Sequence, residues 1–390
     1  MKHKSRMRSA LKGIIVMFLW GQTTTLFAQE ILTKSEAVKL TLENNYDIKI
    51  ARNDVRKAEN NASIFNSGYL PTLGVDASVD TRQNNTNIST ANDGLEERFN
   101  GVNSREYNAN AEVSYVIFDG MGRAYNFKKL KETRNLSKLE ARQIMEASLL
   151  DLFTVYFEVG RLTENLRQQK QTLETSKQRL LRATYNYEYG QGNRLDVLNA
   201  EVDVNNDSIG VLEVGQQLSN SKRDLNVILG RDVKEIFEVE TDVKYTEGLE
   251  LNELLESASA RNVTILQAEK NIQISKLDFK ISKSGLLPKL SAYAGYGYNR
   301  LIGDGRISSR PDQANLGVVA GVTMTWAVFD GGLTKTRIQN SKIDMANRRI
   351  QMEQIENVLE RNVVNAWETY QNALFILSAE QKNVETNKLN

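Results

Sequence analysis

The residues that most often carry enzyme chemistry are nearly absent from this chain. It has no cysteine, which excludes a disulfide framework, a thiolate metal site and a cysteine nucleophile. The only histidine is His3, in a segment with the pattern of a cleaved leader. The mature chain would therefore lack the commonest general base, the usual zinc ligand and the histidine of a serine triad. Catalysis by carboxylates alone stays open as an alternative. The prediction from the missing residue types is no enzyme, no metal site and no cofactor.

Nucleotides and nucleic acids are not indicated as ligands either. Two glycine-rich stretches, GQG at 190–192 and GYGYNRLIGDG at 295–305, superficially resemble phosphate-binding loops. Neither has the Lys-Ser/Thr pair of a P-loop, and the second lies in a predicted strand and loop. Lysine and arginine together number 50, against 49 aspartates and glutamates. This balance gives no basic excess for nucleic acid and no acidic excess for disorder.

Positions 1–28 have the pattern of an export signal. Basic residues precede an apolar core at 13–20 (GIIVMFLW), and Ala28 is the expected cleavage site before Gln29. The alternative is a membrane anchor, but a spanning helix needs about 20 apolar residues. No later stretch is long and apolar enough for such a helix. The protein is expected to leave the cytoplasm and, if it crosses a membrane, to do so without helices.

The mature chain opens with a predicted helix that ends at a sharp junction. Thr33 and Glu36 fit a capping box at its start. The sequence SGYLPTL at 67–73 stops it, because Gly68 can cap a helix and Pro71 disfavours helix in the residue before it. This stretch is therefore predicted to be a helix-to-strand junction.

Period-2 alternation then predicts two amphipathic strands, at 71–82 and 109–119. The segment 83–107 between them is rich in Asn, Ser, Thr and Gly and is predicted to be a long polar loop. The second strand ends in an FDG sequence, which marks the change from strand to helix. Its residues are Phe118, Asp119 and Gly120.

A long helical hairpin is predicted over 121–229. Its first helix, 121–189, would be roughly 100 Å long at 1.5 Å per residue. A leaky seven-residue repeat of the coiled-coil type follows it. The apolar positions of this repeat are Val159, Leu166, Leu173, Leu180 and Tyr187. The sequence YGQGNRLDVL at 189–198 breaks the helix, and Gly230 is the expected cap of the return helix.

After a linker at 231–250, the same order of elements begins again at 251–390. SGLLPKL at 284–290 repeats the junction, with Gly285 and Pro288, and strands are predicted at 288–299 and 316–329. A second FDG follows, at Phe329, Asp330 and Gly331. Pro288 lies 217 positions after Pro71, and the second FDG lies 211 positions after the first. The chain is therefore an internal duplication, with its second half carrying an incomplete helical hairpin.

The strand pairs have the length and face pattern of transmembrane barrel strands. An ordinary soluble hairpin with one buried face would show the same alternation. The export signal and the lack of any other layer to cover these strands favour the membrane. Four strands cannot close a barrel, and open edges are not tolerated in lipid. Copies would then have to share one barrel of eight, twelve or sixteen strands.

The order helix, LPxL, strand, loop, strand, FDG and long helix, present twice, resembles the TolC-type outer-membrane efflux proteins. The resemblance covers nearly all of the mature chain, and YGQGNRLDVLNAE is similar to the hairpin turn of that family. It implies long helical hairpins that form a periplasmic α-barrel. It also implies four strands per chain in a twelve-stranded β-barrel shared by a homotrimer in the outer membrane of a Gram-negative bacterium.

The resemblance further implies an exit duct for efflux or secretion, with no active site. Substrates would be delivered by an inner-membrane pump through a periplasmic adaptor, and the outer part would contact membrane lipid. The hairpin turn would be the periplasmic tip at which the adaptor docks. A plain helix-hairpin turn would also need its glycines. The tip residues are Tyr189, Gly190, Gly192, Arg194, Leu195, Asp196 and Leu198.

The sequence departs from the family pattern at its end. By the offset of 211, Asn390 corresponds to Arg179, before the second tip would begin. The expectation is a truncated form, whose encoding DNA carries a further Leu-Asp-Val-Leu-like turn downstream. The family places aperture-closing residues on that second hairpin, so none is assigned here.

Two other function classes share the long helices. A periplasmic coiled-coil adaptor, or membrane fusion protein, would need Gly-rich lipoyl-like and small β-barrel domains flanking one hairpin. A structural coiled-coil scaffold would give the strand pairs no purpose. The alternation of two strand pairs with helices favours the channel over both.

Overall fold

The computed structural model describes residues 31–89, 96–243, 245–303 and 312–389. The predicted export signal therefore lies outside the described residues. The chain forms two compact units. One holds the described residues up to Lys49 together with Met145–Tyr245, and the other holds Ile50–Ile144 and the described residues from Thr246 onward.

The first unit has a core built where three helices and a small sheet meet. Its helices are α2 (Lys34–Asn44), the second part of α4 (Gly122–Glu188) and α5 (Arg194–Leu229). The strands β1 (Ile31–Leu32) and β4 (Glu238–Val239) pair in parallel. The core side chains are Leu32, Ala37, Leu152, Tyr156, Val159, Leu225, Leu229, Phe237 and Val239.

Part of this core comes from the segment predicted to be a linker. Phe237 and Val239 are buried, at 1% and 8% exposed. Asn226 of α5 donates from its amide nitrogen to the carbonyls of Val233 and Glu235, which holds the segment against the helix. The segment predicted to be a linker thus contributes two side chains to the core. The sequence did not predict this burial, because two apolar residues in an irregular segment show no periodicity.

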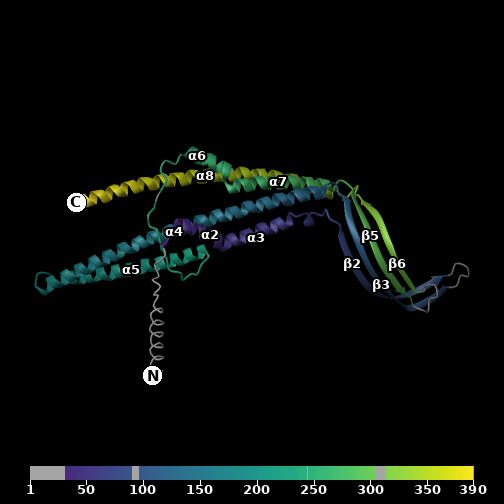
Figure 1. Ribbon diagram of the computed structural model, residues 1–390, viewed down its shortest axis with the longest axis horizontal. Coiled ribbons are helices and arrows are strands. Elements are labelled where there is room, and N and C mark those ends of the chain that lie inside the picture. The colour runs from purple at the N-terminus through teal and green to yellow at the C-terminus, as the bar shows by residue number, and fades with distance from the viewer. Residues whose placement is uncertain (1–30, 90–95, 244, 304–311, 390) are drawn as a thin grey trace, which may run out of the picture. The chain divides into compact units, whose positions relative to one another are not determined.

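The α4–α5 hairpin packs through small residues of α5. A Cβ added to Gly210 would lie 3.5 Å from the side-chain oxygen of Gln169, and one added to Gly215 would lie 4.0 Å from Leu166. Gln169, three residues after Leu166, is a polar residue at an intervening position of the seven-residue repeat, and it lies opposite Gly210, which has no side chain. The leaky repeat is thus accommodated where the helices approach closely. Figure 1 shows the two helices side by side up to the turn that joins them.

The second unit contains most of α3 (Tyr46–Asn61), the first turns of α4, and α6 (Leu251–Arg261), α7 (Val263–Ser284) and α8 (Leu333–Leu389). The helices α6 and α7 both pack against α8 (Figure 1). Among the described residues, no helix has both the length and the low polarity needed to span a membrane.

Each predicted opening helix is broken once by an asparagine. Asn45 separates α2 from α3, and its Oδ1 accepts from the backbone N–H groups of Asp47 and Ile48. Asn262 separates α6 from α7 and accepts in the same way from Thr264 and Ile265. The two asparagines lie 217 positions apart, as the two junction prolines do. The prediction of one continuous helix per half was wrong, because it overlooked a helix-capping residue at matched places in both copies.

A four-stranded antiparallel sheet in the order β2-β3-β5-β6 completes the second unit (Figure 1). The strands are β2 (Thr72–Ser89), β3 (Glu96–Phe118), β5 (Lys289–Ile302) and β6 (Gln313–Thr325). Most of the predicted loop 83–107 is therefore strand. Its mostly polar residues do not alternate with apolar ones, so the sequence shows no strand signal there. The strands pair here through backbone hydrogen bonds, which do not require an apolar face.

Two other predicted bounds also change. The first helix does not reach Ser67 but ends at Asn61, before a 3₁₀ turn (Ile64–Asn66). The last predicted strand, 316–329, ends at Thr325, and Trp326 lies beyond it.

Candidate functional site

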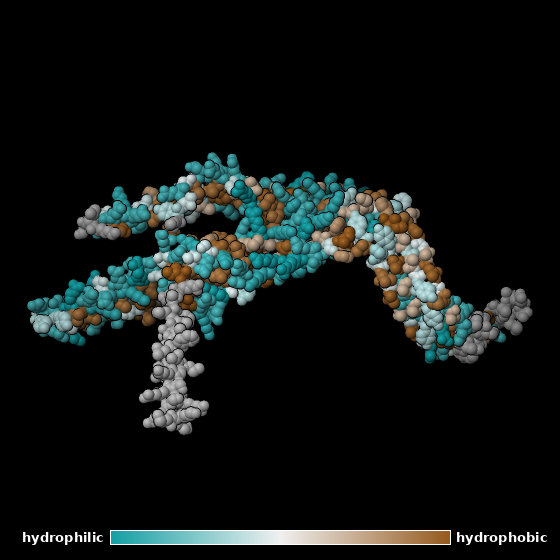
Figure 2. Space-filling model, viewed as in Figure 1, coloured by the Kyte–Doolittle hydropathy of each residue, from teal (hydrophilic) through white to brown (hydrophobic). Residues whose placement is uncertain are grey.

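The sheet presents one apolar and one polar face, and the strand register shows which residues share each. Val75 lies opposite Ala111, which lies opposite Tyr296, which lies opposite Val318. Rows of this kind repeat along the strands. Exposed large side chains on this face are Leu73, Val75, Val79, Val113, Tyr115, Tyr296, Tyr298, Leu316, Val318, Val322 and Met324. In the space-filling view, apolar residues recur over the strands, and the end of the sheet near the hairpin loops is hydrophilic (Figure 2).

The opposite face is polar and acidic. Asp76 lies opposite Asn110, and Asp80 lies opposite Glu106. Glu106 is 3.7 Å from the guanidinium of Arg82 and accepts a hydrogen bond of 2.9 Å from Asn299. Elsewhere on this face, glycines of β5 and β6 add no side chains above the backbone. A sheet with these two faces suits an apolar medium on one side and water on the other.

Both strand-to-helix turns at the FDG sequences have the same geometry. Gly120 and Met121 have φ of +66° and +70°, and the matching Gly331 and Gly332 have φ of +70° and +89°. In each turn the aspartate accepts a 2.8 Å hydrogen bond from the backbone N–H four residues later, at Arg123 or Thr334. The aspartate therefore caps the new helix, and the left-handed pair reverses the chain.

The second turn holds an ionised aspartate, Asp330, at the start of a helix. Hydrogen bonds from the side chain and backbone of Thr334 lower the pKa of Asp330 below its ordinary value. The carboxylate thus stays ionised at the N-terminus of α8, where a negative charge is favourable.

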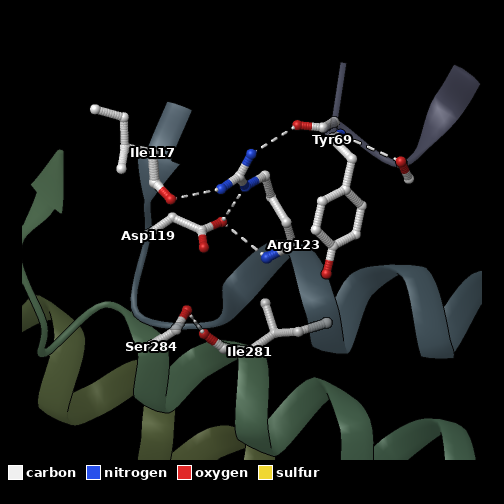
Figure 3. Close-up of polar contacts among 8 residues, drawn as sticks. Tyr69, Ile117, Asp119, Arg123, Ile281 and Ser284 are labelled. Atoms are coloured by element: carbon white, nitrogen blue, oxygen red, sulfur yellow. Dashed lines mark hydrogen bonds and ion pairs between the residues drawn. The ribbon is translucent and has the colours of Figure 1, made fainter. Parts of the chain in front are cut away.

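The first turn is additionally held by Arg123 (Figure 3). Its guanidinium donates to the carbonyl oxygens of Gly68 and Ile117, at 3.1 and 3.2 Å, and its Nε lies 3.4 Å from the carboxylate of Asp119. The same guanidinium lies over the rings of Tyr69 and Tyr115. One side chain of α4 therefore ties the SGYLP turn, the end of β3 and the FDG turn together.

The second half makes the corresponding tie with a different residue. Trp326 donates from its indole nitrogen to the carbonyl of Leu286, at 3.1 Å, within SGLLP. The glycines of the two junctions also differ. Gly68 has φ of +75°, whereas Gly285 has φ of −64° and ends α7 in a right-handed conformation. Gly285 is the C-cap of α7, so the two junctions share their sequence pattern but differ in the backbone conformation of the glycine. Pro71 and Pro288 each directly precede a strand.

The hairpin turn between α4 and α5 is organised by its glycines and one asparagine. Gly190 has φ of +76°, and Gln191 donates its backbone N–H to Asn186, at 2.7 Å. A Cβ on Gly192 would lie 3.2 Å from Cβ of Asn186, so a larger residue would be crowded there. Asn193 caps α5 by accepting from the N–H of Asp196, at 2.9 Å.

The side chains around this turn are solvent-exposed and partly apolar. Tyr189 is 77% exposed, Leu195 63% and Leu198 44%. The Arg194 guanidinium lies 5.9 Å from the ring centroid of Tyr187. A shallow cavity of about 370 Å³ lies beside them, and Asp196 contributes to its wall. The remaining wall residues are Arg179, Arg182, Ala183, Asn186, Gln191 and Gly192.

The predicted residues thus lie in two separate regions of the structure. Tyr189, Gly192, Arg194 and Asp196 lie at one hairpin turn, and the FDG and LP residues lie at the ends of the sheet. The contacts of Arg123, the hydrogen bond from Trp326 to Leu286 and the cap at Asn193 were not predicted. Asparagine is a common helix N-cap, so the cap before Arg194 could have been predicted from the sequence. The hydrogen bond from Arg123 to Gly68 joins residues 55 positions apart and could not. Among the described residues, no three acidic or histidine side chains are placed to hold a metal ion.

Comparisons with known proteins agree with this geometry. The profile of the family "Outer membrane efflux protein" matches residues 37–231 and 254–388. The chain belongs to the outer membrane efflux protein family. Membership places it among transport proteins rather than among enzymes, and among outer-membrane efflux channels rather than adaptors or scaffolds.

Individual relatives of this efflux channel are distant in sequence. Outer membrane protein TolC of Salmonella enteritidis is 20% identical over 352 residues, covering 89% of this chain and 69% of that protein. TolC of Escherichia coli (strain K12) is 21% identical over 354 residues, with the same two shares covered.

Solved structures support the fold. The chain matches CusC with a TM-score of 0.70 and 15% identity, covering 90% of this chain and 79% of that one. It matches VceC from Vibrio cholerae with a TM-score of 0.66 and 13% identity, covering 87% and 79%. The predicted fold of long helices with a strand pair in each half is therefore confirmed.

Proposed function

We propose that this efflux channel is one protomer of a homotrimeric exit duct that conducts substrates passively through the outer membrane. The observation that carries the proposal is the sheet. It has a continuous apolar face, and β2 and β6 each pair on one side only within the described chain. An exposed edge is not tolerated in lipid, because no water is present to satisfy its N–H and C=O groups.

A second copy can satisfy both edges. If β6 of one copy pairs with β2 of the next, a ring of copies closes a barrel without free edges. Two copies would give eight strands, whose interior side chains fill. Three copies give twelve strands and room for a conduit, and the trimer is also what the family resemblance implies.

The helices would form the periplasmic part of the duct. In this arrangement the α4–α5 hairpin continues the wall away from the membrane, and its turn is the tip. Tyr189, Leu195 and Leu198 expose apolar surface there. We propose that a periplasmic adaptor docks on this tip and connects the duct to an inner-membrane pump, with Arg194 and Asp196 in direct contact or in gating.

The assembly is tested by membrane fractionation followed by gel electrophoresis of unheated and heated samples. A detergent-resistant trimer in the outer-membrane fraction that dissociates on heating is the expected result. A monomer in the soluble periplasmic fraction would overturn the proposal.

Docking at the tip is tested with Tyr189→Ala combined with Leu195→Ala. Both side chains are mostly exposed, so the trimer should form normally while efflux and cross-linking to the adaptor fall. Leu212→Ala is the matched control, since Leu212 is 73% exposed on the same helix but distant from the turn in sequence. Equal loss in both variants, or no loss at the tip, would contradict docking there.

A further inference from the structure

The apolar face of the sheet carries two arginines at one end. In the register, Tyr107 of β3 lies opposite Arg300 of β5, and Arg105 lies opposite Ile302. Arg105 and Arg300 are thus diagonal neighbours on the same face as Ala109 and Tyr298. Diagonal neighbours across an antiparallel pair lie about 7–8 Å apart, within reach of long side chains.

Charges on the regular part of the sheet are sorted by face. Between the bulge at Asn84 and the helix junctions, every acidic residue of the described strands lies on the polar face: Asp76, Asp80, Glu106 and Glu112. Arg82 lies there too and pairs with Glu106. Arg105 and Arg300 are exposed on the other face, and neither forms an ion pair with a described residue.

The position of these arginines matches the border of a membrane. From Leu290 to Arg300 is ten residues along β5, or roughly 34 Å at about 3.4 Å per residue. A strand tilted by about 40° reduces this to about 26 Å along the membrane normal, close to the apolar band of about 25 Å in outer-membrane barrels. Tyr107 and Tyr298 lie beside the arginines, as expected for an interfacial aromatic belt.

We propose that Arg105 and Arg300 form a binding site for the anionic phosphate headgroup of a lipid in the outward-facing leaflet. This inference rests on the proposed function, in which the apolar face contacts lipid and the hairpin end faces outward. A guanidinium offers several donors in a planar fork that matches phosphate oxygens. The neighbouring rows hold the acyl chains against Tyr296 and Val318, so that one lipid contacts both parts of the surface.

The site is complete within one chain. β3 and β5 are the two inner strands of the sheet, so both arginines lie away from the edges at which copies would pair. The partner is therefore a lipid rather than a neighbouring protomer. Among the described residues of the paired strands, no acidic side chain shares their face in the adjacent rows, and Asp312, directly before β6, accepts a hydrogen bond from the backbone N–H of Gly303.

The test uses the full-length protein purified in a mild detergent, with lipopolysaccharide as probe. Binding of the phosphorylated form, its dephosphorylated form and inorganic phosphate is compared by native mass spectrometry and by thermal stabilisation. The variant is Arg105→Gln combined with Arg300→Gln. At about 1 kcal/mol per arginine near a phosphate surface, its affinity for the phosphorylated lipid should fall about 10- to 30-fold.

Arg82→Gln is the matched control, because it removes an arginine from the opposite face of the same sheet. It should leave lipid binding unchanged. Equal binding of both lipopolysaccharide forms to the wild type, or no loss in the double variant, would overturn the site. Inorganic phosphate binding as tightly as the lipid would overturn the assignment to a lipid. Wild-type protein absent from the outer membrane would instead overturn the proposed function, which separates the two failures.

Discussion

At the scale of single residues, the two FDG turns show that matched sequences can have different packing. Gly120 and Gly331 have nearly the same left-handed φ, but their surroundings differ. A Cβ on Gly120 would lie 2.6 Å from the carbonyl oxygen of Ser284, whereas one on Gly331 would meet nothing within 4 Å. Gly120 is therefore required both for its conformation and for the close approach of α7.

Alanine at these two positions should separate the two requirements. Gly331→Ala loses only the glycine advantage at positive φ, which costs about 1 kcal/mol. Gly120→Ala adds the overlap with Ser284 and should cost about 2–4 kcal/mol. Thermal unfolding midpoints of the purified variants measure the difference. A Gly331 variant as unstable as the Gly120 variant would show that packing at Ser284 is unimportant.

The ion pair of Glu132 and Lys270 predicts a pH dependence. The hydrogen bond from Lys270, 2.9 Å long, lowers the pKa of Glu132 below 4.5 in the folded protein. A lowered folded pKa means that the stabilisation is present above about pH 4.5 and is lost as the pH falls through the folded value. Both side chains are about one quarter exposed.

Lys270→Met should therefore destabilise the protein at pH 7 by about 1 kcal/mol or less, with the difference shrinking below pH 4.5. Stability is followed by thermal unfolding across pH 3.5–7, kept within the range where wild type remains folded. Lys57→Met is the control, because its pair with Asp54 is mostly exposed. A difference that grows towards low pH would contradict the assignment.

At the scale of elements, the broken opening helices give a second matched pair. Asn45 accepts two backbone N–H groups and also donates to the carbonyl of Ile228, at 3.0 Å. For Asn262, the side-chain hydrogen bonds to described residues are the two that it accepts, from the backbone N–H groups of Thr264 and Ile265. The first asparagine thus caps a helix and fastens it to α5, and the second is a cap alone.

Aspartate keeps the accepting oxygen but removes the donor. Asn262→Asp should therefore be almost neutral, whereas Asn45→Asp should cost about 1–2 kcal/mol, because the carboxylate also lies near the Ile228 carbonyl. Alanine at either position should cost about 1 kcal/mol or more through loss of the cap. Unfolding midpoints of the four variants measure this, and equal effects of aspartate at both sites would contradict the role of the Ile228 contact.

The elements also show how far the sequence predicts this structure. Period-2 alternation located all four strands, because each has one apolar face. It failed beyond Gln83, where both faces are polar and only backbone pairing defines the strand. The helix breaks were missed although both asparagines lie at the same offset as the prolines. For the tip, glycine and Asp-Val-Leu spacing located the turn, but they did not indicate the helix cap at Asn193.

At the scale of the whole molecule, the duplication extends to single hydrogen bonds. Tyr156 of α4 donates from its hydroxyl to the carbonyl of Leu32, at 2.7 Å. Trp367 of α8 donates from its indole to the carbonyl of Leu249, at 2.9 Å. The donors lie 211 positions apart and the acceptors 217, the same offsets as the FDG and LP sequences. Each half thus ties its long helix to the residue before its opening helix, with different side chains supplying the donor.

The polar face of the sheet gives a prediction for the assembled duct. In the proposed trimer this face lines the conduit, and it carries Asp76, Asp80, Glu106 and Glu112, with Arg82 offsetting one charge. Three copies would repeat these carboxylates around the wall. A wall of one sign raises the local concentration of ions of opposite charge, with an effect that weakens as salt increases.

Ion selectivity is measured as the reversal potential of the protein in planar lipid bilayers under a potassium chloride gradient. The wild type should prefer potassium over chloride, most strongly at low salt. Asp76→Asn combined with Glu112→Gln should reduce this preference, since neither carboxylate is neutralised by an ion pair with a described residue. Arg105→Gln combined with Arg300→Gln, on the lipid-facing side, should leave the reversal potential unchanged. A charge in the conduit acts on passing ions, whereas a charge facing lipid is separated from them by the wall. A shift of selectivity in the arginine variant but not in the acidic variant would therefore reverse the assignment of the two faces.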